Sequence, residues 1–292
     1  MRLLTLLLFF SLSLSQTFST YDYVGSRATA MSGSITSGPS GEWSIFHNPA
    51  QLSDLDQSIM TSGICQIYNL NFLSYSHFGL AYNGWGINFE QMTTEINNTT
   101  LSKESVLGIA RGIQLYKDRQ SILQSGIRLN LYSYNFGKSA GLEGDGSTGI
   151  NLGSGYAQGI DLGFQGILNH KYYIGYYMQN VISYIDSPSL GSNLPKSFSI
   201  GLSYKPYQDL LTSLDINQLS GHTDSEIRFG IEYKVIESFK IRTGLQSNPN
   251  RFSGGFELSK LNIGNSNLSI AYSFLTHHVL PMTHQFSISL DF

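Results

Sequence analysis

The stretch from Glu226 to Val235 has the sequence EIRFGIEYKV, in which apolar residues alternate with charged or small ones. Successive side chains of a β-strand point to opposite faces, whereas a helix would spread both kinds around its circumference. This stretch therefore predicts a strand with one apolar face and one charged face. The same period of two recurs in five further C-terminal segments, around Phe198–Lys205, Phe239–Gln246, Phe252–Ser259, Leu268–Phe274 and Phe286–Phe292.

The N-terminal half alternates less regularly. Asn83-Gly84, a dipeptide that favours a tight hairpin turn, separates two alternating segments. Further alternating segments lie at 107–115, 123–131, 160–164 and 172–178, and we expect two more strands within 59–75. The count is roughly fourteen, and bacterial membrane barrels close with an even number of strands.

Alternation alone leaves open whether the apolar face meets a protein core or lipid, so composition is the next guide. Charged residues are 13%, half of what is usual for soluble domains, while glycine (30) and tyrosine (18) are abundant. A secreted sandwich or adhesin could share this composition. Recurring segments of about ten residues with short turns favour an all-β, transmembrane antiparallel barrel with an apolar outer face.

The first residues predict export. Met1-Arg2 is positively charged, Leu3 to Phe10 is apolar, and Ser13-Leu14-Ser15 has the form of a signal-peptidase site. We therefore expect residues 1–15 to be a cleaved signal peptide, with a buried N-terminal helix as the alternative. The predicted organisation is a signal peptide at 1–15, an N-terminal plug at 16–58 and the barrel at 59–292, in a bacterial outer membrane.

Residues 16–58 do not alternate, which is why a plug inside the barrel is predicted there. Small residues surround Arg27 and Met31, and small residues let backbones approach closely. Asn48-Pro49-Ala50 is a favourable helix start, with Asn as the cap and Pro in the first turn. A flexible periplasmic tail is the alternative. The candidate plug residues are Gly25, Arg27, Ala28, Met31, Gly33, Asn48, Pro49 and Ala50.

The polar faces of the last strands carry charges that would point into the lumen. They are Glu226, Arg228, Glu232, Lys234, Lys240, Arg242 and Glu257. If Val235 pairs with Phe239, antiparallel register places Glu232 opposite Arg242 and Lys234 opposite Lys240. We expect a braced cluster in which Glu257 or another acid separates the lysines. The alternative is a wide aqueous lumen in which these side chains do not interact.

Other features indicate what the chain does not carry. The seven histidines lack metal-ligand spacing, no motif points to a nucleophile or cofactor, and the net charge of −3 does not suggest nucleic acid. We therefore expect neither an enzyme nor a metal or cofactor site. The terminal aromatic Phe292 is expected to be a signal read by the barrel-assembly machinery.

Several motifs resemble the PorV/PorQ family of outer-membrane proteins. The resemblance rests on the Gly25–Gly33 stretch and Asn48-Pro49-Ala50, with Ser32 and Gln51 as departures, and on Asp161-Leu162-Gly163, Asn180, Leu194-Pro195 and Thr283–Ser287. That family is similar to FadL-type barrels, which have an internal N-terminal plug and move hydrophobic molecules. Some members work with the type IX secretion system and help carry cargo proteins to the surface.

Two functions follow from this resemblance. One is a type IX secretion or surface-assembly component that acts through secretion-system proteins or exported cargo. The other is a FadL-like transporter of small hydrophobic ligands. A mixed-charge lumen would suit the first better, because a channel for apolar substrates should be lined by apolar groups.

Overall fold

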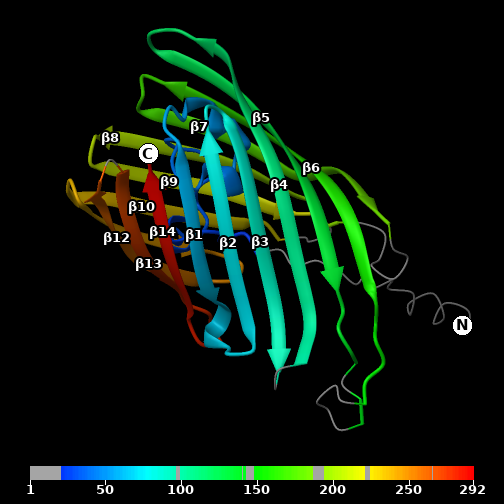
Figure 1. Cartoon of the computed structure of the whole chain (residues 1–292). Helices are drawn as coiled ribbons and strands as arrows, with labels where there is room; N and C mark the ends of the chain where they lie inside the picture. Colours follow the sequence, from blue (N-terminus) through cyan, green and yellow to red (C-terminus); the bar gives the residue numbers. More distant parts are fainter. Residues whose placement is uncertain are drawn as a thin grey trace, which may run out of the picture.

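The computed structural model describes residues 21–96, 99–139, 141–142, 148–186, 194–220, 224–264 and 266–292, so the predicted signal peptide lies outside the described residues. The chain forms a closed antiparallel barrel of 14 strands (Figure 1). The strands are β1 (Ile59–Gln66), β2 (Leu73–Tyr82), β3 (Trp85–Ile96), β4 (Thr99–Lys117), β5 (Ser121–Asn135), β6 (Ser154–Leu168), β7 (Tyr172–Ile185), β8 (Ser197–Tyr207), β9 (Leu210–Leu219), β10 (Glu226–Ile236), β11 (Phe239–Gln246), β12 (Arg251–Ile263), β13 (Ser266–Leu275) and β14 (Thr283–Asp291).

Closure follows from the pairing of the first and last strands. Each strand pairs with its sequence neighbours, and β1 also pairs with β14, with Ile59 opposite Asp291. Outside the strands, Phe292 and Ser58 exchange two backbone hydrogen bonds of 3.0 and 3.2 Å that extend this seam. The predicted all-β barrel is confirmed.

The outer face carries the apolar half of each alternating strand. Phe229, Ile241, Phe256, Ile270 and Ile288 are all exposed. A sandwich would bury this face as its core, so the sandwich alternative is excluded. Among the described residues, no helix is long and apolar enough to cross a membrane.

The two ends of the barrel differ in their connections. At one end all six turns are two or three residues long, as at Asn83-Gly84, where both residues have positive φ (47° and 76°). At the other end most connections have four or more residues. We call these the short-turn end and the long-loop end. In transmembrane barrels they correspond to the periplasmic and extracellular sides.

Residues 21–58 lie inside the barrel as a plug, which excludes the flexible tail for this segment. The plug contains α1 (Ser26–Ala30), η1 (Ser44–Phe46) and η2 (Pro49–Asp54); a fourth short helix, η3 (Ile67–Asn69), connects β1 to β2. Helix α1 packs against β11 to β14, whereas η2 packs against β3 to β6. The plug therefore spans the barrel from wall to wall.

The predicted helix start at Asn48 is confirmed, although η2 is a 3-10 helix. The Asn48 side chain accepts a hydrogen bond from the Ala50 amide at 3.1 Å, and Pro49 occupies the first position. Close packing explains the small residues before it. Gly25 has φ of 92°, and a Cβ there would lie 2.5 Å from the Trp43 ring. A larger residue at this position would force Trp43 out of the plug core.

The hairpin from β10 to β11 corrects one detail of the predicted pairing. Phe239 pairs with Ile236 instead of Val235, because a bulge lies between Lys234 and Ile236. Beyond the bulge the predicted register holds, with Glu232 opposite Arg242 and Lys234 opposite Lys240. The tight turn needs the extra residue, and the bulge accommodates it without moving the charged pairs.

Candidate functional site

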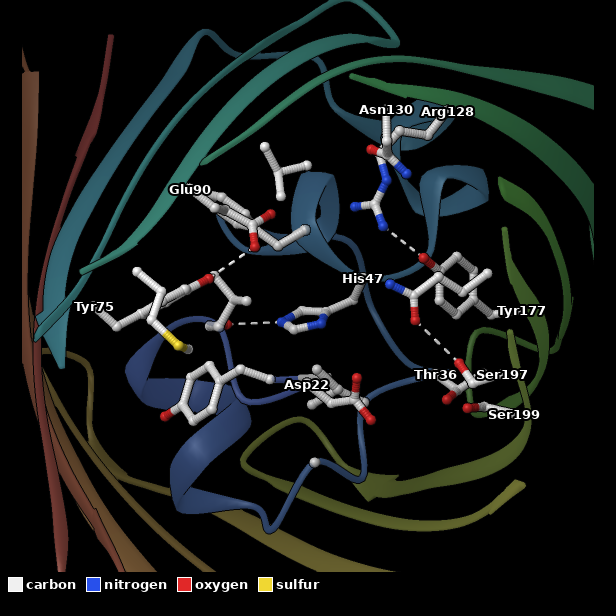
Figure 2. A pocket seen from close by; sticks show the side chains of 18 of the residues that line it. Asp22, Thr36, His47, Tyr75, Glu90, Arg128, Asn130, Tyr177, Ser197 and Ser199 are labelled. Carbon is white, nitrogen blue, oxygen red and sulfur yellow. Dashed lines mark hydrogen bonds between the residues drawn. The ribbon is translucent and has the colours of Figure 1, made fainter. Parts of the chain in front are cut away.

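A cavity of about 100 Å³ lies between the plug and the barrel wall. Plug residues that line it include Tyr21, Val24 and His47, and Figure 2 shows His47 among the wall residues. The barrel wall also lines it, through residues that include Tyr75, Glu90, Glu104, Val106, Arg128, Asn130, Tyr132, Tyr177, Ser197 and Ser199. Ser197 and Tyr75 lie near the long-loop ends of β8 and β2, so the cavity is on the long-loop side of the plug.

The first group of buried polar residues, which we call the Arg128 cluster, connects this cavity to the plug. It consists of Arg128, Asn130, Asp161 and Tyr177. Arg128 Nη2 lies 2.7 Å from Asp161 Oδ2, with both side chains almost fully buried. Asn130 and Tyr177 also donate to Asp161 Oδ2, at 2.7 and 2.9 Å. Arg128 Nη1 donates to the carbonyl of Ile45 in the plug at 2.8 Å. The cluster therefore holds the plug against β5.

A bulge in β7 completes the Arg128 cluster. The register between β6 and β7 shifts between Ile160 and Leu162, and Asn180 there has φ of 52°. Its backbone amide donates to Asp161 Oδ1 at 2.7 Å. Buried charges are tolerated when the remaining lone pairs are hydrogen-bonded, and here both oxygens of Asp161 have donors.

The second group, which we call the Arg242 cluster, contains Arg27, Glu232, Lys240, Arg242 and Glu257. Glu232 Oε2 accepts from Arg242 at 2.6 Å and from Arg27 of the plug at 3.0 Å. Glu257 accepts from Arg242 at 2.6 Å and from Lys240 at 2.8 Å. The predicted pair is thus part of a larger network, which sequence reasoning did not connect to Arg27.

The remaining predicted lumen charges lie elsewhere. Lys234 is at the short-turn end and pairs with Asp209 and Glu237, at 2.9 and 3.1 Å. Arg228 pairs with Glu226 at 2.5 Å and with Asp22 of the plug at 3.1 Å. The two opposed lysines therefore pair with different acids, Lys240 with the predicted Glu257 and Lys234 with Asp209 and Glu237.

The observed positions of the seven predicted lumen charges change what they imply about the ligand. Of the seven predicted residues, only Arg228 contributes to the cavity lining. The others brace the wall, contact the plug or lie at its rim. The hypothesis that a mixed-charge lumen disfavours apolar ligands therefore does not rest on these seven residues; the charged residues that do line the cavity are Asp22, Glu90, Glu104, Arg128 and Arg228.

The residues of the predicted plug motif pack within the plug and against the barrel wall. Ala28 and Met31 are buried together with Ile35, and Ala50 is fully buried. Gly33 has φ of 77° and passes close to the Arg228 guanidinium. The Asn48 side chain donates to the Thr36 carbonyl at 2.9 Å and to that of Phe164 in β6 at 3.2 Å. Asn48 therefore connects two parts of the plug to the wall.

His47 is the plug residue nearest the middle of the cavity. Figure 2 shows it between the Tyr75–Glu90 pair and the Arg128–Tyr177 pair. Its Nε2 bonds the Val24 carbonyl at 2.8 Å, so Nε2 carries the proton and Nδ1 is an acceptor in the neutral ring. Burial lowers the pKa of His47 to about 3, which keeps the ring neutral near pH 7.

Sequence reasoning missed most of the cavity. Arg128 and Asn130 alternate with apolar residues in β5, a pattern that by itself indicates only a strand. Asp161 and Asn180 entered only through the family resemblance. Glu90 and His47 carried no local signal. In the part of the chain that the structure describes, no group of three or more His, Cys, Asp or Glu is placed to hold a metal.

The fold is similar to that of solved outer-membrane transporters. The toluene transporter TodX of Pseudomonas putida has a TM-score of 0.59 and 13% identity, over 95% of this chain and 99% of that one. The toluene transporter TbuX of Ralstonia pickettii gives 0.58 and 13%, over 92% and 97%. A Pseudomonas aeruginosa FadL homologue gives 0.56 and 10%, over 92% and 98%. No protein-family model and no curated protein matches the chain.

These comparisons support the FadL-type part of the resemblance at the level of the fold. The PorV/PorQ part stays a prediction, since none of these matches bears on it.

Proposed function

We propose that the chain is an outer-membrane transporter that takes up small hydrophobic molecules through a plugged lumen. The observation that carries the proposal is the cavity between the plug and the long-loop mouth, in a barrel whose plug spans it from wall to wall. The apolar outer belt supports a place in the outer-membrane bilayer. The likeness in fold to TodX and TbuX, described as toluene transporters, supports the ligand class.

The barrel-assembly machinery is the partner proposed for biogenesis, with Phe292 as its signal. Phe292 is exposed beside the seam between β1 and β14, where a recognition residue would be accessible. A type IX secretion role rests on the sequence motifs alone. Co-purification of secretion-system or cargo proteins in mild detergent would favour that role over transport.

Uptake with a filled cavity tests the proposal. Val106 lines the cavity, whereas Leu107 on the same strand faces outward and is exposed. We expect Val106→Trp to reduce toluene uptake by cells with an intact outer membrane to the level of cells without the protein. Leu107→Trp adds the same ring on the lipid side and should leave uptake unchanged. Equal uptake by both variants would contradict a path through this cavity.

A further inference from the structure

Glu90 places in the cavity wall a carboxylate that forms no ion pair with any residue the structure describes. Its Oε2 accepts from the Tyr75 hydroxyl and its Oε1 from the Asn88 amide, both at 2.8 Å. Both donors are neutral, and among the described residues no ion pair includes Glu90. A carboxylate removed from water without a counter-ion carries a desolvation cost that a cationic ligand would offset.

The cations near this carboxylate are already paired. Arg128 pairs with Asp161, and Arg228 pairs with both Asp22 and Glu226. Including Glu90, four carboxylates therefore face two guanidinium groups around the cavity. His47 is neutral near pH 7 and adds no positive charge. The charge balance around the cavity is negative.

Five aromatic residues contribute to the remaining wall, beside polar and aliphatic ones. Tyr21, Phe46, Tyr75, Tyr132 and Tyr177 all contribute to it. Aromatic rings carry a negative face that attracts ammonium groups, and aromatic walls beside a carboxylate are a usual way to bind organic cations. The same rings also contact the apolar part of a ligand.

The cavity limits the size of the ligand. Its volume of about 100 Å³ is smaller than the ~150 Å³ of an engineered cavity that holds benzene. A single ring therefore already fills the space present in this conformation, and a ring with a short substituent requires the cavity to widen.

We propose that the cavity selects small organic cations, in which an ammonium group is attached to an apolar body and Glu90 is its acceptor. The proposal rests on the proposed function and narrows its ligand class from hydrophobic molecules to amphipathic amines. The ammonium would lie against Glu90 and the tyrosines, and the apolar body would occupy the space beside Val106 and Phe46.

Calorimetric titration of the folded full-length barrel in detergent tests this, with three ligands that share one ring: toluene, benzylamine and benzoate at pH 7. We expect benzylamine, protonated at this pH, to bind at least about tenfold more tightly than toluene, since a hydrogen bond to a charged group contributes roughly that factor. Benzoate should bind most weakly. This comparison uses the unaltered chain and does not depend on any variant folding.

Two variants assign the effect to Glu90. Glu90→Gln should lower the affinity for benzylamine about tenfold and leave that for toluene unchanged. Glu95→Gln removes a charge from an exposed position on the same strand and should change neither. Equal binding of toluene and benzylamine, or an unchanged benzylamine affinity in Glu90→Gln, would overturn the selectivity while leaving transport intact. Failure of all three ligands to bind would overturn the proposed function as well.

Discussion

At the scale of single residues, buried charges hold the plug in place. Arg27 and Asp22 of the plug each pair with a charged residue of β10, and Arg128 of β5 donates to a plug carbonyl. Removing one partner from a buried pair is costly, by about 3–5 kcal/mol, because the other charge is left buried. The plug's position therefore depends on a few side chains on opposite walls.

The first prediction concerns Glu232. Glu232→Lys should lower the unfolding midpoint in denaturant, because a lysine there faces both Arg27 and Arg242. Adding Arg242→Glu should restore part of the loss by re-forming the pair in reverse. Recovery should be incomplete, since Arg27 and Glu257 then face like charges. Glu237→Gln, at the exposed turn of the same hairpin, is the control and should change the midpoint little. A double variant no better than the sum of the singles would contradict the pairing.

The second prediction concerns the pH dependence contributed by His47. Its pKa in the folded plug is about 3, below its ordinary value of 6.5, so the unfolded plug takes up a proton as the pH falls below 6.5 and the folded plug does not. The stability contributed by the neutral ring is present above pH 6.5 and is lost as the pH falls toward 3. Arg128, Arg27 and His77 lie close enough to oppose protonation further.

Two acids of the plug change its stability with pH in the opposite direction, so a His47 variant is needed to measure the contribution of His47 alone. Burial raises the pKa of Asp22 and of Glu42, which favours the folded plug as the pH falls. Fluorescence of Trp43 in a Trp85→Phe background would report on the plug. On acidification from pH 7 to 4.5, the unaltered plug should loosen more than His47→Gln, whose amide can still donate to Val24. If the Trp43 fluorescence of the unaltered protein and of His47→Gln changed identically with pH, His47 would not be the source of the pH dependence.

At the scale of elements, the contact between η2 and β6 can be tested with two glycines on one strand. A Cβ at Gly163 would lie 2.1 Å from Asn48 Oδ1, while a Cβ at Gly166 has open space around it. Gly163→Ala should therefore displace the Asn48 cap and increase hydrogen exchange in residues 25–52, whereas Gly166→Ala should not. Asn48→Ala should act like Gly163→Ala, with a loss of at least the ~1 kcal/mol of a helix cap. Equal exchange in both glycine variants would contradict the contact.

The elements differ in how far the sequence predicts them. Strands such as β10 and β11 have one lipid-facing side, so alternation is strict and even the register is predictable. Strand β4 runs from Thr99 to Lys117, whereas alternation indicated only 107–115, because its long-loop half is polar on both faces. The helix start at Asn48 follows from local cap chemistry. The plug's partners on the wall depend on contacts between residues far apart in the sequence, from 83 positions for Ile45 and Arg128 to 205 for Arg27 and Glu232, which no local pattern contains.

At the scale of the whole molecule, the fold is predictable and the site is not. Closure follows from the number of strands and the lipid-facing belt. The cavity, by contrast, combines residues of the plug with five or more strands, and its polar side chains occupy the same alternating positions as those that only brace the wall. Seven charges were predicted to face the lumen, and the sequence could not distinguish the one that lines the cavity from those committed to the plug.

If the chain is the proposed transporter, ligands can pass only when the plug moves, because the plug spans the barrel. A reversible crosslink tests this most directly. A Cβ at Gly255 of β12 would lie 2.9 Å from the Cβ of Ala30 in α1, but also 2.6 Å from the carbonyl oxygen of Tyr272, so Ala30→Cys/Gly255→Cys requires β12 to shift from both before the disulfide forms. A Cys65→Ala background removes the native thiol.

Toluene uptake would be measured in cells that produce this variant, before and after reduction. The account predicts uptake at background level while the disulfide is formed, and recovery to the level of the Cys65→Ala parent once it is reduced. Uptake that is equal in the oxidised and reduced states would show that molecules pass without movement of the plug, and would contradict the account.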